Sequence, residues 1–558
     1  MPATSQKHLY WFIGAITIIN LLQASFTELI YDEAYYWYFS TQLDWGYFDH
    51  PPIVAWMIGL GGLFFKGSLG VRVVGVLMSA ATYLIIWNTI SNQKKWNYIN
   101  HFLVLIFSMT LLNAYGFFSL PDTPLLFFTA LLFFLLKRFY KAESWALSLA
   151  IGLVMAALMY SKYHAVLVIL GVLFGYRKLL ISKKAWGAVA VSLVAFTPHL
   201  YWLYEHDFVS VAYHLFERPN RAYDFFDFGL GYWVNLMAIF GLTFPYMYWA
   251  LFKSKANTPL KKSMWGVILT VLIFFFISSF NRRIQTQWVV VICIPIAYLV
   301  FDTLVHHPKL RRRLWVAGSI NIIIIVFLRL GLVYEPLLPI SYEAHGNRAW
   351  TAALKEKAGN TKVVFEDSYR NAPMYAFYSG SKTHSLNSVQ YRQNQYNIDS
   401  SEYEMMGEKV VYVTKDSVNS DFSFPKTKEV LYYGKWITNY KGLSRLQTKI
   451  KRFSKNNIQF TVKNPYKHAV SLDDFSIGLA FLNSYKQFKE LENIELPLTE
   501  NEKKNTYILP GDSITLSGTV QKPENYSNMN FVRLSIAPTS MPYLLGSEHE
   551  KISIWNPF

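Results

Sequence analysis

The sequence has a single cysteine, Cys293, in 558 residues, and few charged residues. One cysteine excludes an intramolecular disulfide framework and any metal site built from several cysteines. Charged residues make up 16% of the chain, whereas soluble globular proteins carry about 25%. Hydrophobic residues reach 52%, and the last third of the chain is polar, so the apolar excess lies in the first part. This composition predicts a polytopic membrane protein with a soluble C-terminal region.

Acidic residues are also scarce, with 36 Asp and Glu against 53 Lys and Arg and a net charge of +17. A strongly basic chain can bind nucleic acid. Here the basic residues lie mostly in short runs between apolar segments, which favours the positive-inside bias of membrane loops. We therefore expect membrane lipids as partners and no nucleic acid. The first apolar run lacks an A-x-A cleavage site, which predicts an uncleaved first span.

Eleven apolar segments are candidates for transmembrane helices, which need about 20 residues each. Several of the segments are short. The still shorter stretch 51–65 is interpreted as a helix at the membrane interface, with a twelfth span as the alternative. The eleven segments are roughly 9–27, 69–90, 98–118, 122–138, 145–161, 163–178, 185–204, 229–252, 263–280, 286–304 and 313–333.

Basic loops alternate with longer or acidic loops along this region. The positive-inside rule then places the N-terminus in the cytoplasm, and an odd number of spans places the C-terminal region outside. Arg282 and Arg283 are the main exception to the alternation. The basic loops lie at 94–95, 137–141, 177–184, 253–262 and 309–313.

The sequence changes character after Val333. In 334–440, two short apolar runs at 363–365 and 410–413 predict buried strands around a helix near 369–378, which indicates a small α/β segment. From 441 to 558, polar and apolar residues alternate in short runs separated by turn formers, which predicts an antiparallel β-sandwich. The expected domains are therefore 1–333, 334–440 and 441–558.

Ionisable residues gather in the loops assigned to the outer face. They are Asp32-Glu33 and Asp49-His50 in the first loop, Asp122 in the next, and then Lys162 and Arg283. Separate explanations exist: an interfacial aromatic belt around the first loop, a helix cap at Asp122, and a snorkelling Lys162. Their coincidence on one face favours a functional site, because charge beside the membrane is costly.

Carboxylates and cations at a membrane surface suit glycosyl transfer from a sugar phosphate. A base must take the proton of the acceptor, and a carboxylate can do this if it is correctly placed. Cations hold the phosphate and stabilise it as it leaves. Asp32 or Glu33 fits the first role, and Lys162 with an arginine fits the second.

The motifs D-E-x-Y-Y, Y-F-D-H-P-P, P-D-T-P and S-K-Y-H, in this order, resemble those of the GT-C membrane glycosyltransferases. The most similar branch is bacterial, related to protein O-mannosyltransferases and to the lipid A aminoarabinose transferase. The resemblance covers 1–333 and extends into 350–396. It implies an α-helical polytopic GT-C membrane domain of about 11 transmembrane helices in a bacterial inner membrane. The α/β segment and the β-sandwich would follow it on the periplasmic side.

The resemblance also implies roles for individual residues. Asp32 matches the catalytic acidic position of the family, and Glu33 is its usual companion. Asp49 matches a second acid that lies near a metal in some relatives, which leaves a divalent metal possible although no metal ligand and no cofactor is assigned. The expected donor- and phosphate-binding residues are Tyr35, Tyr36, Asp49, His50, Asp122, Lys162 and Arg283.

Two positions depart from the aminoarabinose branch. Tyr35 stands where that branch has an arginine, and His50 stands where it has a lysine. These departures argue against the same sugar or acceptor as in the aminoarabinose enzyme.

The implied function is transfer of a sugar from a polyprenyl-phosphate donor to an acceptor on the outer face of the inner membrane. Candidate acceptors are an envelope glycolipid such as lipopolysaccharide, a polysaccharide or a protein. The alternative is a transporter or flippase of a lipid-linked sugar, but transporters place ionisable groups near the midplane and often show internal repeats. A receptor or assembly protein would leave Asp32, Glu33 and Lys162 unexplained. The β-sandwich either recognises an acceptor or a partner, or is structural.

Overall fold

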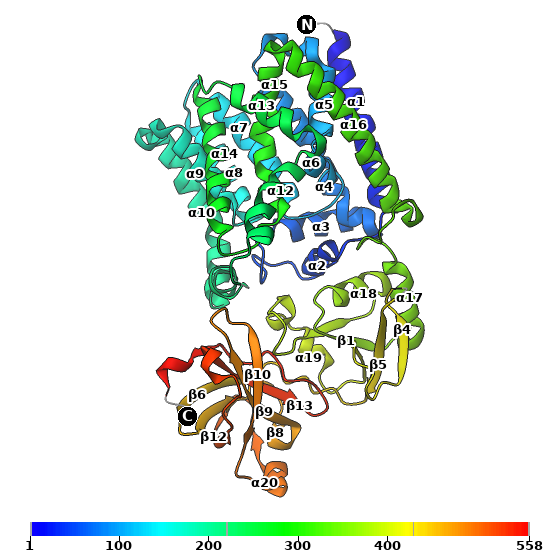
Figure 1. The fold of residues 1–558 in the computed structure, drawn as a ribbon, viewed down its shortest axis with the longest axis vertical. Helices are drawn as coiled ribbons and strands as arrows, with labels where there is room; N and C mark the ends of the chain where they lie inside the picture. The colour runs from blue at the N-terminus through cyan, green and yellow to red at the C-terminus, as the bar shows by residue number, and fades with distance from the viewer. Residues whose placement is uncertain (1–2, 219–220, 428, 556–558) are drawn as a thin grey trace. The chain divides into compact units, whose positions relative to one another are not determined.

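The computed structural model of the protein describes residues 3–218, 221–427 and 429–555. It divides into two compact units (Figure 1). The helical unit comprises the chain up to Ala212 together with Arg221–His345. The β-rich unit comprises the chain from Gly346 onward together with a short segment that begins at Tyr213.

The helical unit is built mainly from apolar helices. Its α-helices are α1 (Ala3–Phe26), α2 (Tyr31–Ser40), α3 (Ile53–Phe64), α4 (Gly67–Thr89), α5 (Ile99–Phe107), α6 (Thr110–Ala114), α7 (Asp122–Phe139), α8 (Trp145–Ser161), α9 (Ala165–Gly175), α10 (Lys183–Glu205), α11 (Val209–Ala212), α12 (Gly231–Ala238), α13 (Phe244–Lys253), α14 (Pro259–Ser278), α15 (Cys293–His306) and α16 (Pro308–Val333).

Among the described residues, five helices are long and apolar enough to cross a membrane, and a sixth span results if one bent pair is counted together. Each of the eleven predicted segments contains helix, but the expected number of eleven spans is not confirmed by length. The segment 98–118 is broken into α5 and α6. The segment 229–252 bends by 95° between α12 and α13. The five long helices are Gln6–Phe26, Gly67–Thr89, Lys183–Glu205, Pro259–Ser278 and Pro308–Val333.

Both breaks are held by one side chain, Asn321 of α16, which is 3% exposed. Its amide nitrogen donates to the carbonyl of Ser108, at the break between α5 and α6, over 2.6 Å. Its amide oxygen accepts from the backbone N–H of Leu242, at the break between α12 and α13, over 3.2 Å. Gly241 has a φ of +54°, and a Cβ there would lie 2.6 Å from Asn321 Oδ1, so this approach requires glycine. Backbone groups that a broken helix frees inside a membrane must find such partners.

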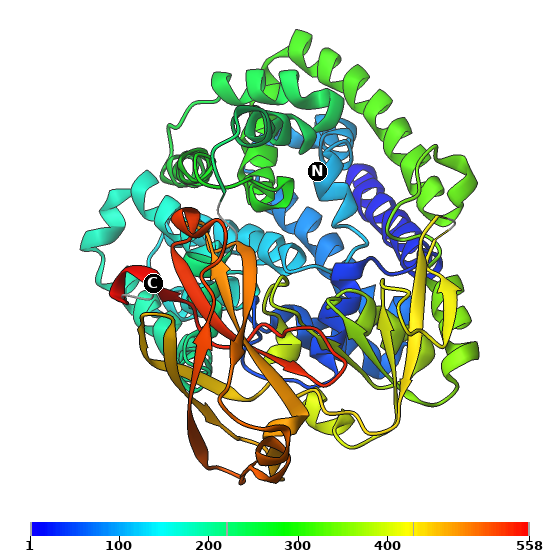
Figure 2. The ribbon, with the colours of Figure 1, turned by 60° about the horizontal axis from the view of Figure 1, so that its bottom comes forward.

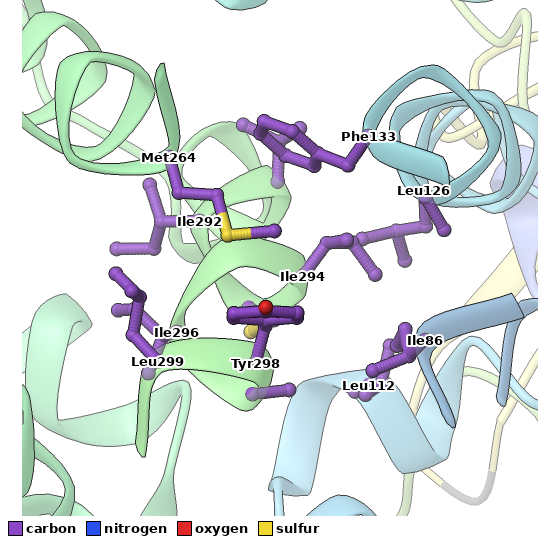
Figure 3. Close-up of a cluster of buried hydrophobic side chains, with 14 of the residues drawn as sticks. Ile86, Leu112, Leu126, Phe133, Met264, Ile292, Ile294, Ile296, Tyr298 and Leu299 are labelled. Carbon is purple, nitrogen blue, oxygen red and sulfur yellow. The ribbon is translucent and has the colours of Figure 1, made fainter. Parts of the chain in front are cut away.

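The core of the helical unit surrounds α15, in which twelve of the fourteen residues are buried. A helix that is apolar on all sides is stable only when other helices enclose it. In Figure 3, Ile294 of α15 lies between Met264 of α14 and Leu126 of α7, with Phe133 of α7 above them and Tyr298 of α15 below them in this view. The centre of the unit around α15 is therefore apolar.

The β-rich unit begins with a mixed five-stranded sheet in the order β2-β1-β3-β5-β4. β1 pairs in parallel with β2 and β3, and β5 pairs antiparallel with β3 and β4. The predicted strands at 363–365 and 410–413 and the predicted helix near 369–378 are confirmed as β1, β3 and α18. The elements are α17 (Asn347–Ala358), β1 (Lys362–Glu366), α18 (Asn371–Ser379), β2 (Thr383–Leu386), α19 (Ser401–Met405), β3 (Val410–Thr414), β4 (Phe422–Pro425) and β5 (Leu431–Ile437).

A second, antiparallel sheet follows in the order β14-β13-β9-β10-β12-β7-β6 (Figure 2, orange to red). The alternation of apolar residues predicted these strands, and they bury one face each. They pair as one continuous series whose two ends share a hydrophobic core, which includes Phe460 of β7 and Leu534 of β13. The elements are β6 (Gln447–Ser454), β7 (Asn457–Lys463), β8 (Val470–Ser471), β9 (Phe475–Leu482), β10 (Phe488–Glu495), α20 (Glu500–Asn505), β11 (Tyr507–Ile508), β12 (Ser513–Val520), β13 (Phe531–Pro538) and β14 (Glu550–Lys551).

The segment from Tyr213 joins this unit although the chain on both sides of it belongs to the helical unit. The Arg392 guanidinium donates to the Tyr213 hydroxyl. The Lys486 ammonium donates to the carbonyl of Phe216 over 3.0 Å. Burial raises the pKa of Glu217, whereas the charges of Arg533 and Lys486 act in the opposite direction.

Candidate active site

The first predicted loop is not a loop along its whole length, because Tyr31–Ser40 form the helix α2. Asp32 and Glu33 occupy its first turn, where the partial positive charge of a helix N-terminus stabilises carboxylates. Glu33 Oε2 also accepts the backbone N–H of Ile30 at 3.3 Å, which satisfies one of the free donors at that end. The aromatic, apolar sequence that follows suggested an interfacial loop, and these terminal contacts explain why it is helical.

Glu33 is fully buried and forms an ion pair with Arg72 of α4, which is also fully buried. The guanidinium donates through Nε to Glu33 Oε1 at 2.8 Å and through Nη2 to Glu33 Oε2 at 2.5 Å. Its other N–H groups donate to the carbonyls of Ala24, Thr27 and Glu28. The pair therefore fastens the start of α2 to α4 and to the end of α1.

Asp32 lies beside this pair and is partly exposed. Successive residues of a helix point about 100° apart, so Asp32 is directed away from the buried Glu33. Burial raises the pKa of the nearby Tyr342 hydroxyl to about 12. The negative charges of Glu343, Glu33 and Asp32 act in the same direction. Asp32 is thus the carboxylate of the predicted catalytic pair that solvent or a substrate can reach.

Asp122 and Lys162 form a second ion pair. Asp122 begins α7, and Lys162 is the residue that follows α8. The Lys162 ammonium donates to both carboxylate oxygens of Asp122, at 2.8 and 3.0 Å. The Tyr115 hydroxyl donates to the same carboxylate at 3.4 Å. The structure therefore brings together the acid and the lysine that the sequence placed in two different loops.

The remaining residues of the first motif form an aromatic cluster on α2. Tyr35 and Tyr36 are buried, and the ring of Tyr36 meets His50 edge-on with a centroid distance of 5.3 Å. Phe39 stacks on Tyr47 at 4.3 Å. Asp49, next to His50, is 6% exposed. The chain from Tyr47 to His50 therefore folds back on α2, which places Asp49 and His50 close to the tyrosines.

Arg283 lies in a different group of side chains. It is 66% exposed, and its Nε lies 3.6 Å from a carboxylate oxygen of Asp227. Asp227 also forms an ion pair with Arg221. The acid that Arg283 contacts is thus Asp227, whereas Lys162 contacts Asp122. Their joint binding of one phosphate remains a prediction.

Sequence and structure comparisons identify relatives of this chain. Residues 49–202 match the family described as dolichyl-phosphate-mannose-protein mannosyltransferase. The lipid A galacturonosyltransferase RgtD of Rhizobium johnstonii is 28% identical over 212 residues, which is 35% of this chain and 42% of that relative. The chain therefore aligns with less than half of the length of this curated relative.

The crystal structures of ArnT from Cupriavidus metallidurans share the fold. The apo form has a TM-score of 0.57 at 12% identity, over 77% of this chain and 98% of ArnT. The form bound to undecaprenyl phosphate has a TM-score of 0.54 at 13% identity, over 76% and 97%. The chain is therefore similar in sequence to these membrane glycosyltransferases and shares the GT-C fold of ArnT. The resemblance predicted from its motifs is confirmed.

The sequence did not predict the role of Arg72 in the helical unit, where it pairs with Glu33. A single arginine in the apolar run Gly70–Gly75 was the available indication, because a charge inside a span usually has a partner. Tyr115 was missed because an aromatic residue next to apolar residues gives no indication of a contact with Asp122.

A second group that was missed fastens the first loop to α10. The buried His199 ring lies 2.7 Å from the Trp45 carbonyl and 3.1 Å from the Tyr163 hydroxyl. The Trp202 indole donates to Asp44 at 2.8 Å. A Cβ on Gly46 would lie 2.4 Å from the Trp202 ring, so only glycine permits this approach. These contacts position the segment 44–46, which leads to Asp49 and His50.

Metal binding was left open for Asp49. In the part of the chain that the structure describes, no group of three or more His, Cys, Asp and Glu side chains is arranged to hold a metal ion.

Proposed function

We propose that the protein is a membrane glycosyltransferase. It transfers a sugar from a polyprenyl-phosphate donor to an envelope acceptor on the outer face of a bacterial inner membrane. The observation that carries this proposal is the contrast within the Asp32-Glu33 pair. Glu33 is fully buried and bound by Arg72, whereas Asp32 stays partly exposed on the same helical turn. A catalytic base needs this combination of access and fixed position.

In the proposed reaction, an acceptor hydroxyl oxygen attacks the anomeric carbon of the donor sugar. The bond between that carbon and the phosphate oxygen breaks, and polyprenyl phosphate leaves with the bonding electrons. The acceptor proton passes to the Asp32 carboxylate. General-base catalysis of this kind contributes about 10²–10⁴ in rate. Lys162 stabilises the leaving phosphate as its negative charge grows.

The Asp122–Lys162 pair supports a phosphate site. Both side chains are largely buried, and the ammonium has three donors of which the described contacts use two on one carboxylate. A phosphate can take over one of these contacts without leaving Asp122 unpaired. Tyr35, Tyr36, Asp49 and His50 would line the donor sugar, and Arg283 would approach the phosphate from the loop after α14.

A lipid-linked donor fits the apolar helical unit better than a nucleotide sugar. The ArnT structure bound to undecaprenyl phosphate supports the same choice. For the acceptor we favour an envelope glycolipid, because RgtD is a lipid A galacturonosyltransferase. A polysaccharide or a protein acceptor would change only the second substrate. Tyr35 and His50 argue for a sugar or an acceptor different from that of the aminoarabinose branch.

The loop charges support an orientation with the β-rich unit on the outer side. We propose 1–333 as the catalytic domain, with 334–440 and 441–558 as accessory parts that meet the acceptor or a partner. Labelling of a Ser420→Cys variant in a Cys293→Ser background tests the orientation. A membrane-impermeant reagent should react at position 420 without permeabilisation of the inner membrane. Reaction only after permeabilisation would contradict it.

The function is tested with the full-length protein in nanodiscs. Radiolabelled sugars are supplied either on polyprenyl phosphate or on the matching nucleotide, each with extracted envelope acceptors. We expect labelled acceptor with the lipid-linked donor and none with the nucleotide sugar. Efficient use of the nucleotide sugar without a lipid carrier would contradict the assignment of a polyprenyl-phosphate donor. Movement of the lipid-linked sugar across vesicles without any product would favour a flippase.

A further inference from the structure

A groove of about 370 Å³ runs along the helical unit between α1, α5 and α16. This volume lies within the range of about 300–1,000 Å³ that ligand sites occupy. Figures 1 and 2 both show α1 and α16 side by side. The walls of the groove are mostly apolar, and they include Phe12, Ile16, Leu103, Phe107 and Ile322.

One end of the groove carries a cation, Arg329 of α16. Its guanidinium donates to the amide oxygens of Asn20 at 2.7 Å, Asn113 at 3.2 Å and Gln23 at 3.4 Å. Its carbon Cζ lies 4.6 Å from the centre of the Phe117 ring. Within the described residues these partners are all neutral, so the positive charge at this end of the groove is not compensated.

Arg329 is partly exposed, and its contacts differ from those of the buried cations of the same unit. Arg72 and Lys162 each contact a carboxylate. A cation at membrane depth without a counter-charge is costly and marks a functional position. Arg329 precedes the end of α16 by four residues, or about 6 Å along the helix axis. With the end of α16 at the membrane surface, as we propose, Arg329 would lie near the level of the lipid phosphates.

The length of the groove matches a lipid chain. Trp315 and Leu330 of α16 both line it, and fifteen residues of helix span about 22 Å. The hydrocarbon of one leaflet is about 15 Å thick, half of the usual 30 Å core. A complete acyl chain can lie against the groove while its head group stays beside Arg329.

We propose that this groove binds one anionic phospholipid, with the phosphate on Arg329 and an acyl chain along α1 and α16. The phosphate supplies the negative charge that the protein lacks at this place, and a guanidinium binds phosphate in a bidentate manner. The site is separate from the proposed transfer reaction. The lipid site and the proposed active site are connected along the chain. Asn113 accepts from Arg329, and Ser119, six residues later, donates its N–H to Glu33 at 2.9 Å.

The proposal is tested by native mass spectrometry of the full-length protein released from nanodiscs of phosphatidylglycerol and phosphatidylcholine. The wild type should retain one phosphatidylglycerol in preference to phosphatidylcholine. Arg329→Gln should lower this retention at least tenfold, and Arg329→Lys should preserve part of it. The matched control is Arg312→Gln, an exposed arginine at the other end of α16, which should retain the lipid.

A second variant guards against loss of folding in Arg329→Gln. Val326 is half-exposed and lines the groove, so Val326→Trp fills the groove without removing the charge. It should also release the lipid, with the thermal unfolding temperature close to that of the wild type. Equal retention of both phospholipids, or unchanged retention in Arg329→Gln, would overturn the proposal. Retention of only added undecaprenyl phosphate would overturn it too, because the occupant would then be the polyprenyl carrier. None of these measurements depends on sugar transfer.

Discussion

The two ion pairs Glu33–Arg72 and Asp122–Lys162 lie in the same helical unit. They differ in how many of their hydrogen-bond donors and acceptors have protein partners. In the first, both side chains have 0% exposure, and Arg72 also donates to three backbone carbonyls. In the second, the side chains are 8% and 4% exposed, and Lys162 donates only to Asp122 among the described residues. The first pair has no capacity left for a ligand, whereas the second can rearrange around one.

This difference suits Glu33–Arg72 to holding the backbone in place and Asp122–Lys162 to binding a ligand. A buried pair whose members are fully hydrogen-bonded fixes the backbone around it, and breaking it leaves a buried charge. A pair with spare donors at the edge of the apolar region can exchange one partner for a phosphate. This contrast supports our proposal that Asp32 is the base, with Glu33 as a positioning residue.

The largest expected effect comes from breaking the saturated pair. Arg72→Met leaves the Glu33 carboxylate buried without a counter-charge, which costs about 3–5 kcal/mol. We expect a lower unfolding temperature in detergent and a poor yield of folded protein. The double variant Glu33→Gln with Arg72→Met should recover part of the stability, as a double-mutant cycle would measure. If Arg72→Met were as stable as the wild type, the Glu33–Arg72 pair would not contribute to the stability of the fold.

The next effect is on turnover alone. Asp32→Asn keeps the size of the side chain and removes the proton acceptor, so transfer should fall by about 10²–10⁴ with an unchanged unfolding temperature. The matched control is Glu205→Gln, which neutralises an exposed carboxylate at the end of α10. Near wild-type turnover in Asp32→Asn would move the role of the base to Asp49.

The second ion pair should give a smaller and mixed effect. A hydrogen bond to a charged group is worth about 1.5–3 kcal/mol, so Lys162→Met should weaken donor binding and slow transfer by about 10- to 100-fold. It should also lower the unfolding temperature, because the largely buried Asp122 carboxylate loses its counter-charge. Lys162→Arg should restore part of both. Arg283→Gln should change them less, because Arg283 is two-thirds exposed and its interactions are screened by salt. Isothermal titration calorimetry measures the donor affinity, and single-turnover assays measure the rate of transfer.

The last prediction concerns the dependence of stability on pH, and it rests on His384 of β2, a buried histidine that stays neutral in the folded protein. Burial and the positive charge of Arg445 lower the pKa of His384, in β2, to about 3. The unfolded chain therefore binds more protons between about pH 6.5 and pH 3, and the β-rich unit should lose stability as the pH falls through this range. The slope should approach 1.4 kcal/mol per pH unit at most. His384→Gln should flatten the acid unfolding curve, whereas the exposed His468→Gln should not.

Local sequence patterns predicted most of the secondary structure. Alternation of apolar residues is sufficient to locate β7, β12 and β13, because each of these strands faces one core. Apolar runs located the helices of the membrane region. They did not predict the 95° bend between α12 and α13, because Asn321, which satisfies its backbone, lies about 80 residues further along the chain.

The candidate site was predicted in part for the same reason. Asp32, Asp122 and Lys162 were found because charge is rare at the ends of apolar segments. Their partners are Arg72 of α4 and Tyr115, which follows α6 in a turn. Only the folding of α4 and of this turn beside α2 and α7 brings them into contact. The position of Arg283 relative to Asp227 also depends on a tertiary contact that spacing along the chain does not encode.

The shared use of Asn321 has a consequence for the biogenesis of the protein. The breaks at Ser108 and at Leu242 are made long before α16 leaves the ribosome, and both need the side chain that α16 carries. Until α16, the last helix of the helical unit, enters the membrane, the freed backbone groups must be satisfied by water or by the insertion machinery. The two broken segments therefore reach their final form together, late in synthesis, and a protein truncated before α16 would expose both to quality control.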